Sequence, residues 1–287
     1  MKRRRFLTLT AAALAIPRSA RAAVWQGTAL GADVSVTLMG RGAQDALAQV
    51  HQTLTRIEAL FSLYTPSTLT QLNTNGTLPA PAAEFTALCQ IISRVHALTG
   101  GCFDPTVQPL WTALATGTDP RAARALIGWD RVTLSPDRIT LAPHQALTFN
   151  GIAQGFATDI ITAELAAAGF TRALINIGEY RALGGPWHIG IDDPAAGQIA
   201  QLALTGQAVA TSSPAAIMAG NTPHILSPSG HPPLWSTASV TAPNAALADA
   251  LSTAFCLMDR AAISQTLAHF PGTQARLIDM NGNLSRA

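Results

Sequence analysis

The chain has 287 residues, carries a formal net charge of +2, and is 48% hydrophobic. This length fits one large domain or two closely packed lobes, with an ample core in either case. The only lysine is Lys2, at the N-terminus. The rest of the chain therefore excludes chemistry that needs a Schiff-base lysine or the lysine of a phosphate-binding P-loop.

The first 22 residues have the pattern of a signal peptide for twin-arginine export. A basic segment over residues 2–5 precedes a short apolar run over 8–16 and a small-x-small cleavage site at 20–22. A transmembrane anchor needs roughly 20 apolar residues, about twice this run. A lipoprotein anchor needs a cysteine near the cleavage site, where none occurs. We therefore expect a twin-arginine signal peptide over 1–22 and a periplasmic domain over 23–287 that does not span the membrane.

Removal of the signal peptide reverses the charge. The segment holds six of the 18 basic residues and none of the 16 acidic ones, which leaves 12 basic residues against 16 acidic ones. This balance argues against nucleic acid as a partner. The three cysteines, Cys89, Cys102 and Cys256, have no metal-binding spacing, and either one disulfide or buried free thiols fits an oxidising compartment.

The N-terminal half begins with an alternating apolar pattern over residues 34–38, which predicts the first strand. Apolar residues at steps of three and four predict a helix over 47–61. The polar loop over 61–67 carries Tyr64, whose ring either packs on the core or stacks on a ligand. A second helix is expected over 83–98, where a pair of glycines ends it.

The middle of the chain is rich in turn residues. Two prolines and an aspartate make residues 102–111 a rigid loop rather than a regular element. A short helix capped at Asp119 and a hairpin formed by 131–134 and 138–141 follow.

Residues 147–159 hold the pattern around which the chain is organised. An alternating, strand-like run ends at Gly151 and Gly155, and a helical pattern begins at once and closes at Gly169. A strand, a glycine turn and a helix N-terminus together favour binding of an anion by backbone N–H groups. The stretch is neither a Walker loop nor a three-glycine dinucleotide fingerprint. The alternative is a helix start whose glycine serves close packing.

The C-terminal half is mainly strands, followed by a helix capped at Asn244. Strands are expected over residues 173–177, 187–191, 200–204, 207–211 and 236–241. His224 lies in a proline-bounded loop over 223–230, which holds its imidazole in a fixed place. No repeat or linker divides the chain after the signal peptide.

Asp249 and Thr253 are four residues apart in this last predicted helix, so their oxygens share one face. In the simpler interpretation, the threonine bonds back to a helix carbonyl and the aspartate complements the helix dipole. A carboxylate and a hydroxyl are also hard-oxygen ligands of the kind that Mg²⁺ accepts, with phosphates, water and a backbone carbonyl completing the shell. Placed against the glycine turn, the pair would make a magnesium–diphosphate site.

Seven segments in this order resemble one known family. The segments span residues 27–31, 61–73, 101–110, 147–159, 176–184, 224–230 and 248–254. Together they are similar to the ApbE-like FAD:protein FMN transferases. The resemblance implies a single large α+β domain, related to the T-fold, with mixed or antiparallel sheets flanked by helices.

The same resemblance implies an enzyme that uses FAD and Mg²⁺. Such an enzyme cleaves the FAD diphosphate and attaches FMN through a phosphoester to a Thr or Ser hydroxyl of an acceptor protein, typically a subunit of a membrane redox complex. The matched metal positions are Asp249, Thr253 and the carbonyl near Gly151. His224 matches a candidate base for the acceptor hydroxyl, and activation of that hydroxyl by magnesium is the competing possibility. The matched FAD-binding positions are Leu30, Tyr64, Cys102, Phe103, Asp104, Thr148, Gln154 and Ile225.

The sequence departs from the usual family pattern in the glycine stretch, where Thr148, Asn150 and Gln154 replace Asp, Gly and Lys. Leu30 replaces a Met, and Ser227 replaces an Asp. The forms Asn-Gly-Ile-Ala-Gln-Gly over 150–155 and Gly-Glu-x-Arg-Ala-Leu-Gly over 178–184 look like a proteobacterial subgroup that includes the NosX-like proteins. Two other functions stay open: a periplasmic FAD-binding protein without transferase activity, and a pyrophosphatase that hydrolyses FAD to FMN and AMP.

Overall fold

The computed structural model describes residues 22–287, so the predicted signal peptide lies outside the described residues except for Ala22. The framework is one eight-stranded sheet whose neighbouring strands all pair antiparallel. In spatial order its strands are β1 (Ala22–Ala29), β2 (Ala32–Met39), β6 (Ala173–Ile177), β7 (Tyr180–Leu183), β10 (Ala208–Ser212), β13 (Thr237–Ala242), β14 (Gln274–Ile278) and β15 (Leu284–Arg286). The α+β class expected from the sequence is confirmed.

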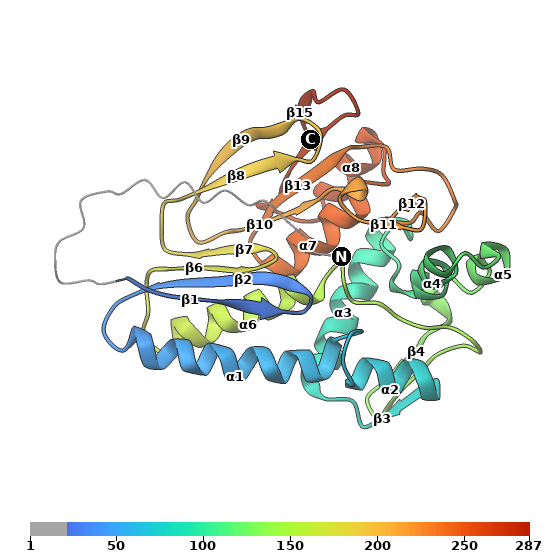
Figure 1. Ribbon diagram of the computed structural model, residues 1–287, viewed down its shortest axis with the longest axis horizontal. Coiled ribbons are helices and arrows are strands. Elements are labelled where there is room, and N and C mark those ends of the chain that lie inside the picture. Colours follow the sequence, from blue (N-terminus) through green and yellow to red (C-terminus); the bar gives the residue numbers. More distant parts are fainter. Residues whose placement is uncertain (1–21) are drawn as a thin grey trace.

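Helices cover one face of this sheet, with α1, α6 and α7 packed on its strands and α3 packed on α7 (Figure 1). The helices are α1 (Ala43–Phe61), α2 (Thr68–Asn75), α3 (Ala83–Leu98), α4 (Gln108–Thr116), α5 (Pro120–Arg124), α6 (Ala153–Ala167), α7 (Ala245–Phe255) and α8 (Arg260–Leu267). The main core lies between the helices and the sheet. Ala173, Ile175 and Ile177 of β6 face it, as the two-residue period of a strand requires.

A separate hairpin of β8 (Trp187–Asp193) and β9 (Gly197–Leu204) covers part of the opposite face. Its inward residues Ile189 and Leu202 form a second, smaller core with Leu174 of β6 and Val209 of β10. The central strands are therefore buried on both faces. Small accessory sheets are formed by β3 (Thr77–Pro79), β5 (Arg138–Thr140) and β4 (Thr133–Ser135), and by β11 (Met218–Ala219) and β12 (Thr222–Pro223).

The structure corrects the sequence-based interpretation at both ends of the sheet. The first strand is β1, which ends in a two-residue turn at Leu30 and Gly31, where both residues have positive φ. The helix with Asp249 is followed by another helix, α8, and by β14 and β15. β1, α8 and β15 were missed because few of their residues are buried, so the apolar period is weak, and β14 is only five residues long.

Two further expectations were wrong in the middle of the chain. The run before Gly151 is not a strand, because Asn73, rather than a neighbouring strand, bonds both the N–H and the carbonyl of Leu147, at 2.7 and 2.9 Å. Within the expected loop over 102–111, Gln108 starts α4. Pro109 is tolerated there because the first turn of a helix needs no N–H from it.

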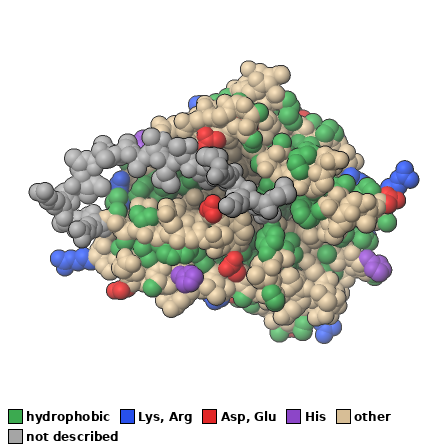
Figure 2. All heavy atoms as spheres, viewed as in Figure 1, with side chains coloured by type: hydrophobic (Ala, Val, Ile, Leu, Met, Phe, Trp, Pro, Cys, Tyr) green, Lys and Arg blue, Asp and Glu red, His purple; other side chains and the backbone are tan. Residues whose placement is uncertain are grey.

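Within residues 22–287, no helix combines the length and hydrophobicity that a membrane span needs. On the face shown in Figure 2, the basic and acidic side chains that are visible are scattered rather than gathered into one patch. This distribution agrees with the count of 12 basic against 16 acidic residues after the signal peptide, which argues against nucleic acid as a partner.

Candidate functional site

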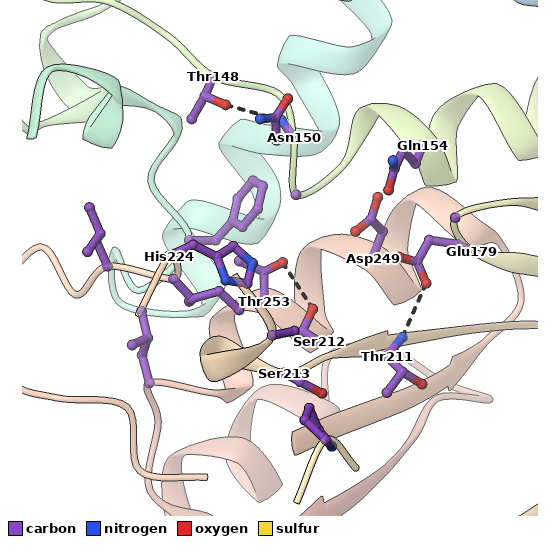
Figure 3. Close-up of a pocket in the computed structure, with 18 of the residues that line it drawn as sticks. Thr148, Asn150, Gln154, Glu179, Thr211, Ser212, Ser213, His224, Asp249 and Thr253 are labelled. Carbon is purple, nitrogen blue, oxygen red and sulfur yellow. Dashed lines mark hydrogen bonds between the residues drawn. The ribbon is translucent and has the colours of Figure 1, made fainter. Parts of the chain in front are cut away.

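A cavity of about 950 Å³ opens where the glycine stretch, α7 and the β8–β9 hairpin meet. Its size is that of a pocket for a large organic ligand. The lining comes from residues 63–64, 102–111, 148–154, 178–180, 189–198, 209–216, 224–226 and 249–257, each segment contributing some of its side chains or backbone. Segments far apart in the sequence thus form one site, drawn in Figure 3.

Helix α7 presents Asp249 and Thr253 to this cavity from one face, as expected from their spacing. Asn244 starts the helix by accepting a hydrogen bond from the Leu247 N–H at 2.9 Å. The Asp249 side chain is buried, and its Oδ2 accepts the N–H of Gly155 at 3.0 Å. The carboxylate therefore lies against the first turn of α6, where the helix dipole favours negative charge.

Gly151 lies directly beside Thr253. A Cβ built on Gly151 would be 3.0 Å from Thr253 Oγ1, so the close approach of backbone and hydroxyl depends on glycine. Ser212 Oγ lies 3.4 Å from the same hydroxyl. The described residues contain no cluster of three or more His, Cys, Asp or Glu side chains suited to a metal. A cation here would thus be bound by one carboxylate with hydroxyl, backbone and ligand oxygens, a set that fits Mg²⁺.

The position of α7 is fixed by Asp159, a residue of α6 to which the sequence-based prediction assigned no role. Its carboxylate accepts the N–H groups of Ala245 and Ala246 at 2.8 and 2.9 Å, and it also pairs with Arg181. Its partners on α7 lie 86 and 87 residues away. No local pattern in the sequence could therefore have identified it.

Leu30 is not among the residues that line the cavity, and its role in FAD binding stays a prediction. The side chain is buried, and the positive φ of the turn directs the backbone carbonyl to Gln154 Nε2, at 3.2 Å. Gln154 lines the cavity beside Gly178, where a Cβ would lie 2.5 Å from Gln154 Oε1. The Leu30 carbonyl therefore helps to hold the Gln154 side chain in place at the cavity.

The loop over residues 102–104 lines the cavity with all three predicted side chains. Phe103 is the apolar wall next to Gly151. The Asp104 carboxylate, however, is held by the Thr106 N–H and hydroxyl and by the Trp129 N–H, so it shapes the loop. Burial raises the pKa of the Cys102 thiol, which keeps it neutral. Cys89, Cys102 and Cys256 are free thiols, which decides between the two alternatives left open by the sequence.

The loop with His224 and Ile225 forms another wall of the cavity. His224 Nδ1 lies 2.9 Å from the Pro214 carbonyl and 3.2 Å from that of Ile217. Since a carbonyl only accepts, Nδ1 carries the proton, and a neutral imidazole then has its lone pair on Nε2. Arg124 holds the same loop by donating to the Ser227 carbonyl at 2.8 Å.

Several residues of the site were missed by the sequence-based prediction. Glu179, in the turn after β6, is buried, and its Oε2 accepts the Thr211 N–H at 3.2 Å. It lies in the segment over 176–184 that the family resemblance includes, next to Gly178, but no role was assigned to it. Ser212 and Ser213 line the floor, and the β8–β9 hairpin adds Asp192 and Asp193. Strand residues of this kind carry no sequence motif.

Asp193 joins the hairpin to the main sheet. Its Oδ2 accepts the hydroxyls of Ser236 and Thr237 at 2.6 and 2.7 Å, and its Oδ1 accepts the N–H groups of Ala195 and Ala196 at 2.9 Å. Burial alone would raise the pKa of Asp193, but these hydrogen bonds outweigh it and hold the pKa below its ordinary value.

The Asp193 contribution to stability is expected to depend on pH. Because its folded-state pKa is lowered, the contribution is present at neutral pH and is lost as the pH falls below 3.8 toward the folded-state value. Asp193→Asn should therefore cost about 2 kcal/mol at pH 7 and less near pH 3. Urea unfolding of both proteins across this range measures the difference, and a cost that does not change with pH would contradict it.

Together, the antiparallel sheet, its one-sided helices and the cavity define an α+β protein with a pocket of ligand size that is lined by carboxylate and hydroxyl oxygens. The model of the ApbE family matches residues 30–277. The chain belongs to the ApbE family. No curated protein sequence gives a significant match.

Solved structures agree with this membership. A flavin transferase ApbE from Vibrio cholerae is 20% identical, with a TM-score of 0.79 over 93% of this chain and 97% of that one. An apo flavinyl transferase ApbE from Pseudomonas stutzeri is 25% identical, with a TM-score of 0.79 over 93% and 94%. An ApbE protein from Thermotoga maritima is 24% identical, with a TM-score of 0.82 over 93% and 97%.

Proposed function

We propose that this protein transfers FMN from FAD to a threonine or serine hydroxyl of a partner protein and needs Mg²⁺ to do so. The observation that carries the proposal is the gathering of the Asp249 carboxylate, the Thr253 hydroxyl and the Gly151 backbone in a cavity that also contains His224. Family membership and the likeness to proteins described as flavin transferases support it.

In the proposed reaction the acceptor hydroxyl attacks the phosphorus of the FMN half, the bond to the AMP phosphate breaks, and AMP leaves. His224 accepts the proton of the hydroxyl on Nε2. Asp249, Thr253 and the backbone at Gly151 would hold Mg²⁺, which when bound neutralises charge on the diphosphate. The N–H groups at the start of α6 add positive potential at the same wall, in a chain whose only lysine lies outside the described residues.

One assay separates transfer from the two other functions. The protein without residues 1–22 is incubated with FAD, Mg²⁺ and a protein fragment that carries an exposed threonine. Transfer gives acid-stable flavin fluorescence on the fragment together with AMP release. AMP release without labelling identifies a pyrophosphatase. Bound FAD with neither product identifies a flavin-binding protein and refutes both enzymatic functions.

His224→Gln is expected to reduce the transfer rate by about 10²-fold or more, because the base for the acceptor hydroxyl is lost, while FAD affinity changes little. Rates of labelling and FAD titrations measure the two effects. His269→Gln, at an exposed site outside the cavity, is the matched control. Equal loss of binding and transfer would make His224 a binding residue, and an unchanged rate would favour activation of the hydroxyl by the metal.

The N-terminal pattern supports the proposal that the protein acts in the periplasm after twin-arginine export. The acceptor would then be a periplasmic segment of a membrane redox complex, as the NosX-like forms of the glycine stretch suggest. Mass spectrometry of the exported protein tests this: we expect a mature chain that begins at Ala23. A full-length chain that stays in the cytoplasm would contradict it.

A further inference from the structure

Tyr64 is an aromatic residue that is half-exposed at the cavity and nevertheless held at several points. Its side chain is 57% exposed and lines the cavity. Its backbone N–H donates to Ser62 Oγ at 3.0 Å, which fixes the loop that carries it. A core-packing role, the alternative considered from the sequence, does not explain an exposed ring at this place.

Two contacts set the orientation of the ring itself. Gly31 lies in the β1–β2 turn with φ +76°, and a Cβ built on it would be 2.9 Å from Tyr64 Cε2. The ring thus rests against backbone that only glycine leaves accessible. On the opposite side of the loop, Asn150 Nδ2 donates to Tyr64 Oη at 3.1 Å. The backbone N–H of Asn150 donates to Thr148 Oγ1 at 3.3 Å, which helps to fix the backbone at Asn150.

We infer that Asn150 is a positioning residue: it holds the ring of Tyr64, which the family resemblance already assigns to FAD binding, as a preformed platform for a planar heteroaromatic ring of the ligand. A side chain already fixed in its bound orientation loses less entropy when the ligand arrives, and aromatic rings stack on such surfaces. The inference rests on the proposed function, in which FAD is the ligand. FAD supplies two rings of this chemistry, isoalloxazine and adenine.

The positioning can be tested without any ligand. The chain contains two tyrosines, so protein labelled with ¹³C in the tyrosine rings gives signals from Tyr64 and the half-buried Tyr180 alone, and Tyr64→Phe assigns them. Asn150→Ala is expected to increase the ring motion and shift the signals of Tyr64, with Tyr180 as the internal reference. Asn75→Ala, an exposed amide of α2 outside the cavity, is the matched control. An unchanged Tyr64 ring in Asn150→Ala would overturn the inference.

The platform is tested by titration with FAD, FMN and AMP. Tyr64→Phe and Asn150→Ala are each expected to weaken FAD binding about three-fold, and the double variant no further, because both remove the same hydrogen bond. A parallel loss with FMN identifies the isoalloxazine ring, and a loss with AMP identifies adenine. Additive losses near nine-fold, or no loss in either variant, would overturn the platform. If the parent protein binds none of the three ligands, both the platform and the proposed function are refuted. The spectra of the ligand-free protein still show whether Asn150 positions the Tyr64 ring.

Discussion

Asp249→Asn is expected to reduce flavin transfer by at least about a hundred-fold, a loss of the size seen when one preorganised charge-stabilising group is removed from an active site. The substitution keeps the shape of the side chain and an oxygen that can accept the Gly155 N–H, whose bond to Asp249 is 3.0 Å long. What it removes is the negative charge that would hold Mg²⁺. The rate of acid-stable labelling, measured over a range of Mg²⁺ concentrations, checks this.

Chelation of divalent ions in the parent protein should give a loss of the same order. Asp259→Asn is the matched control, because Asp259 caps α8 outside the cavity and an asparagine caps a helix equally well. Its transfer rate should equal that of the parent. A parent-like rate for Asp249→Asn at saturating Mg²⁺ would show that the carboxylate does not bind the metal.

Gly155→Ala is expected to destabilise the protein by about 2 kcal/mol, although helix propensity alone would make alanine more favourable by about 1 kcal/mol. A Cβ at this position would meet the carbonyl of Ala245, with its carbon at 2.6 Å, and the nitrogen of Ala246 at 2.8 Å. Since backbone atoms cannot rotate away, α6 and α7 must separate. Thermal unfolding should show the loss as a fall of roughly 4–8 °C.

The control for this variant is Ala163→Gly on the exposed face of the same helix, which propensity alone should destabilise by about 1 kcal/mol. Glycine to alanine at position 155 and alanine to glycine at position 163 would then both destabilise the protein. Transfer should also fall in Gly155→Ala, because its N–H donates to Asp249 and the displaced helix moves that carboxylate. Unchanged stability together with unchanged transfer would mean that the helices can separate without cost.

Local signals in the sequence predicted the parts of the fold that local interactions decide. The helices now labelled α1, α3 and α7, and the cap at Asn244, follow from apolar period and side-chain chemistry. The hydroxyl and carboxylate of α7 were found by their spacing. The prediction of a strand before Gly151 was wrong because the pairing of a strand with a neighbour depends on tertiary structure. Here the side chain of Asn73, 74 residues away, bonds the backbone instead.

The same reason explains what was missed in the site. Asp159 acts on the start of α7 across most of the C-terminal half, and Glu179 acts on Thr211 in another strand. Resemblance placed Leu30 at the ligand by its position in a motif, whereas in the structure its side chain is buried and its carbonyl accepts the hydrogen bond of Gln154, which lines the cavity. Most of the motif positions line one cavity, and long-range hydrogen bonds determine how their side chains are held there.

The β8–β9 hairpin gives the molecule a modular construction. The proposed metal-binding group belongs to the helices and the glycine stretch, whereas the hairpin wall packs on the other face of the main sheet through the second core and is joined to the start of β13 by Asp193. Exposed residues of this wall, such as Pro194 and Gln198, can therefore vary without altering the helix that places Asp249 and Thr253, as long as the buried residues of the hairpin are kept. Under the proposed function, the walls that select the ligand and the group that would hold the metal can in this way diverge separately within one scaffold.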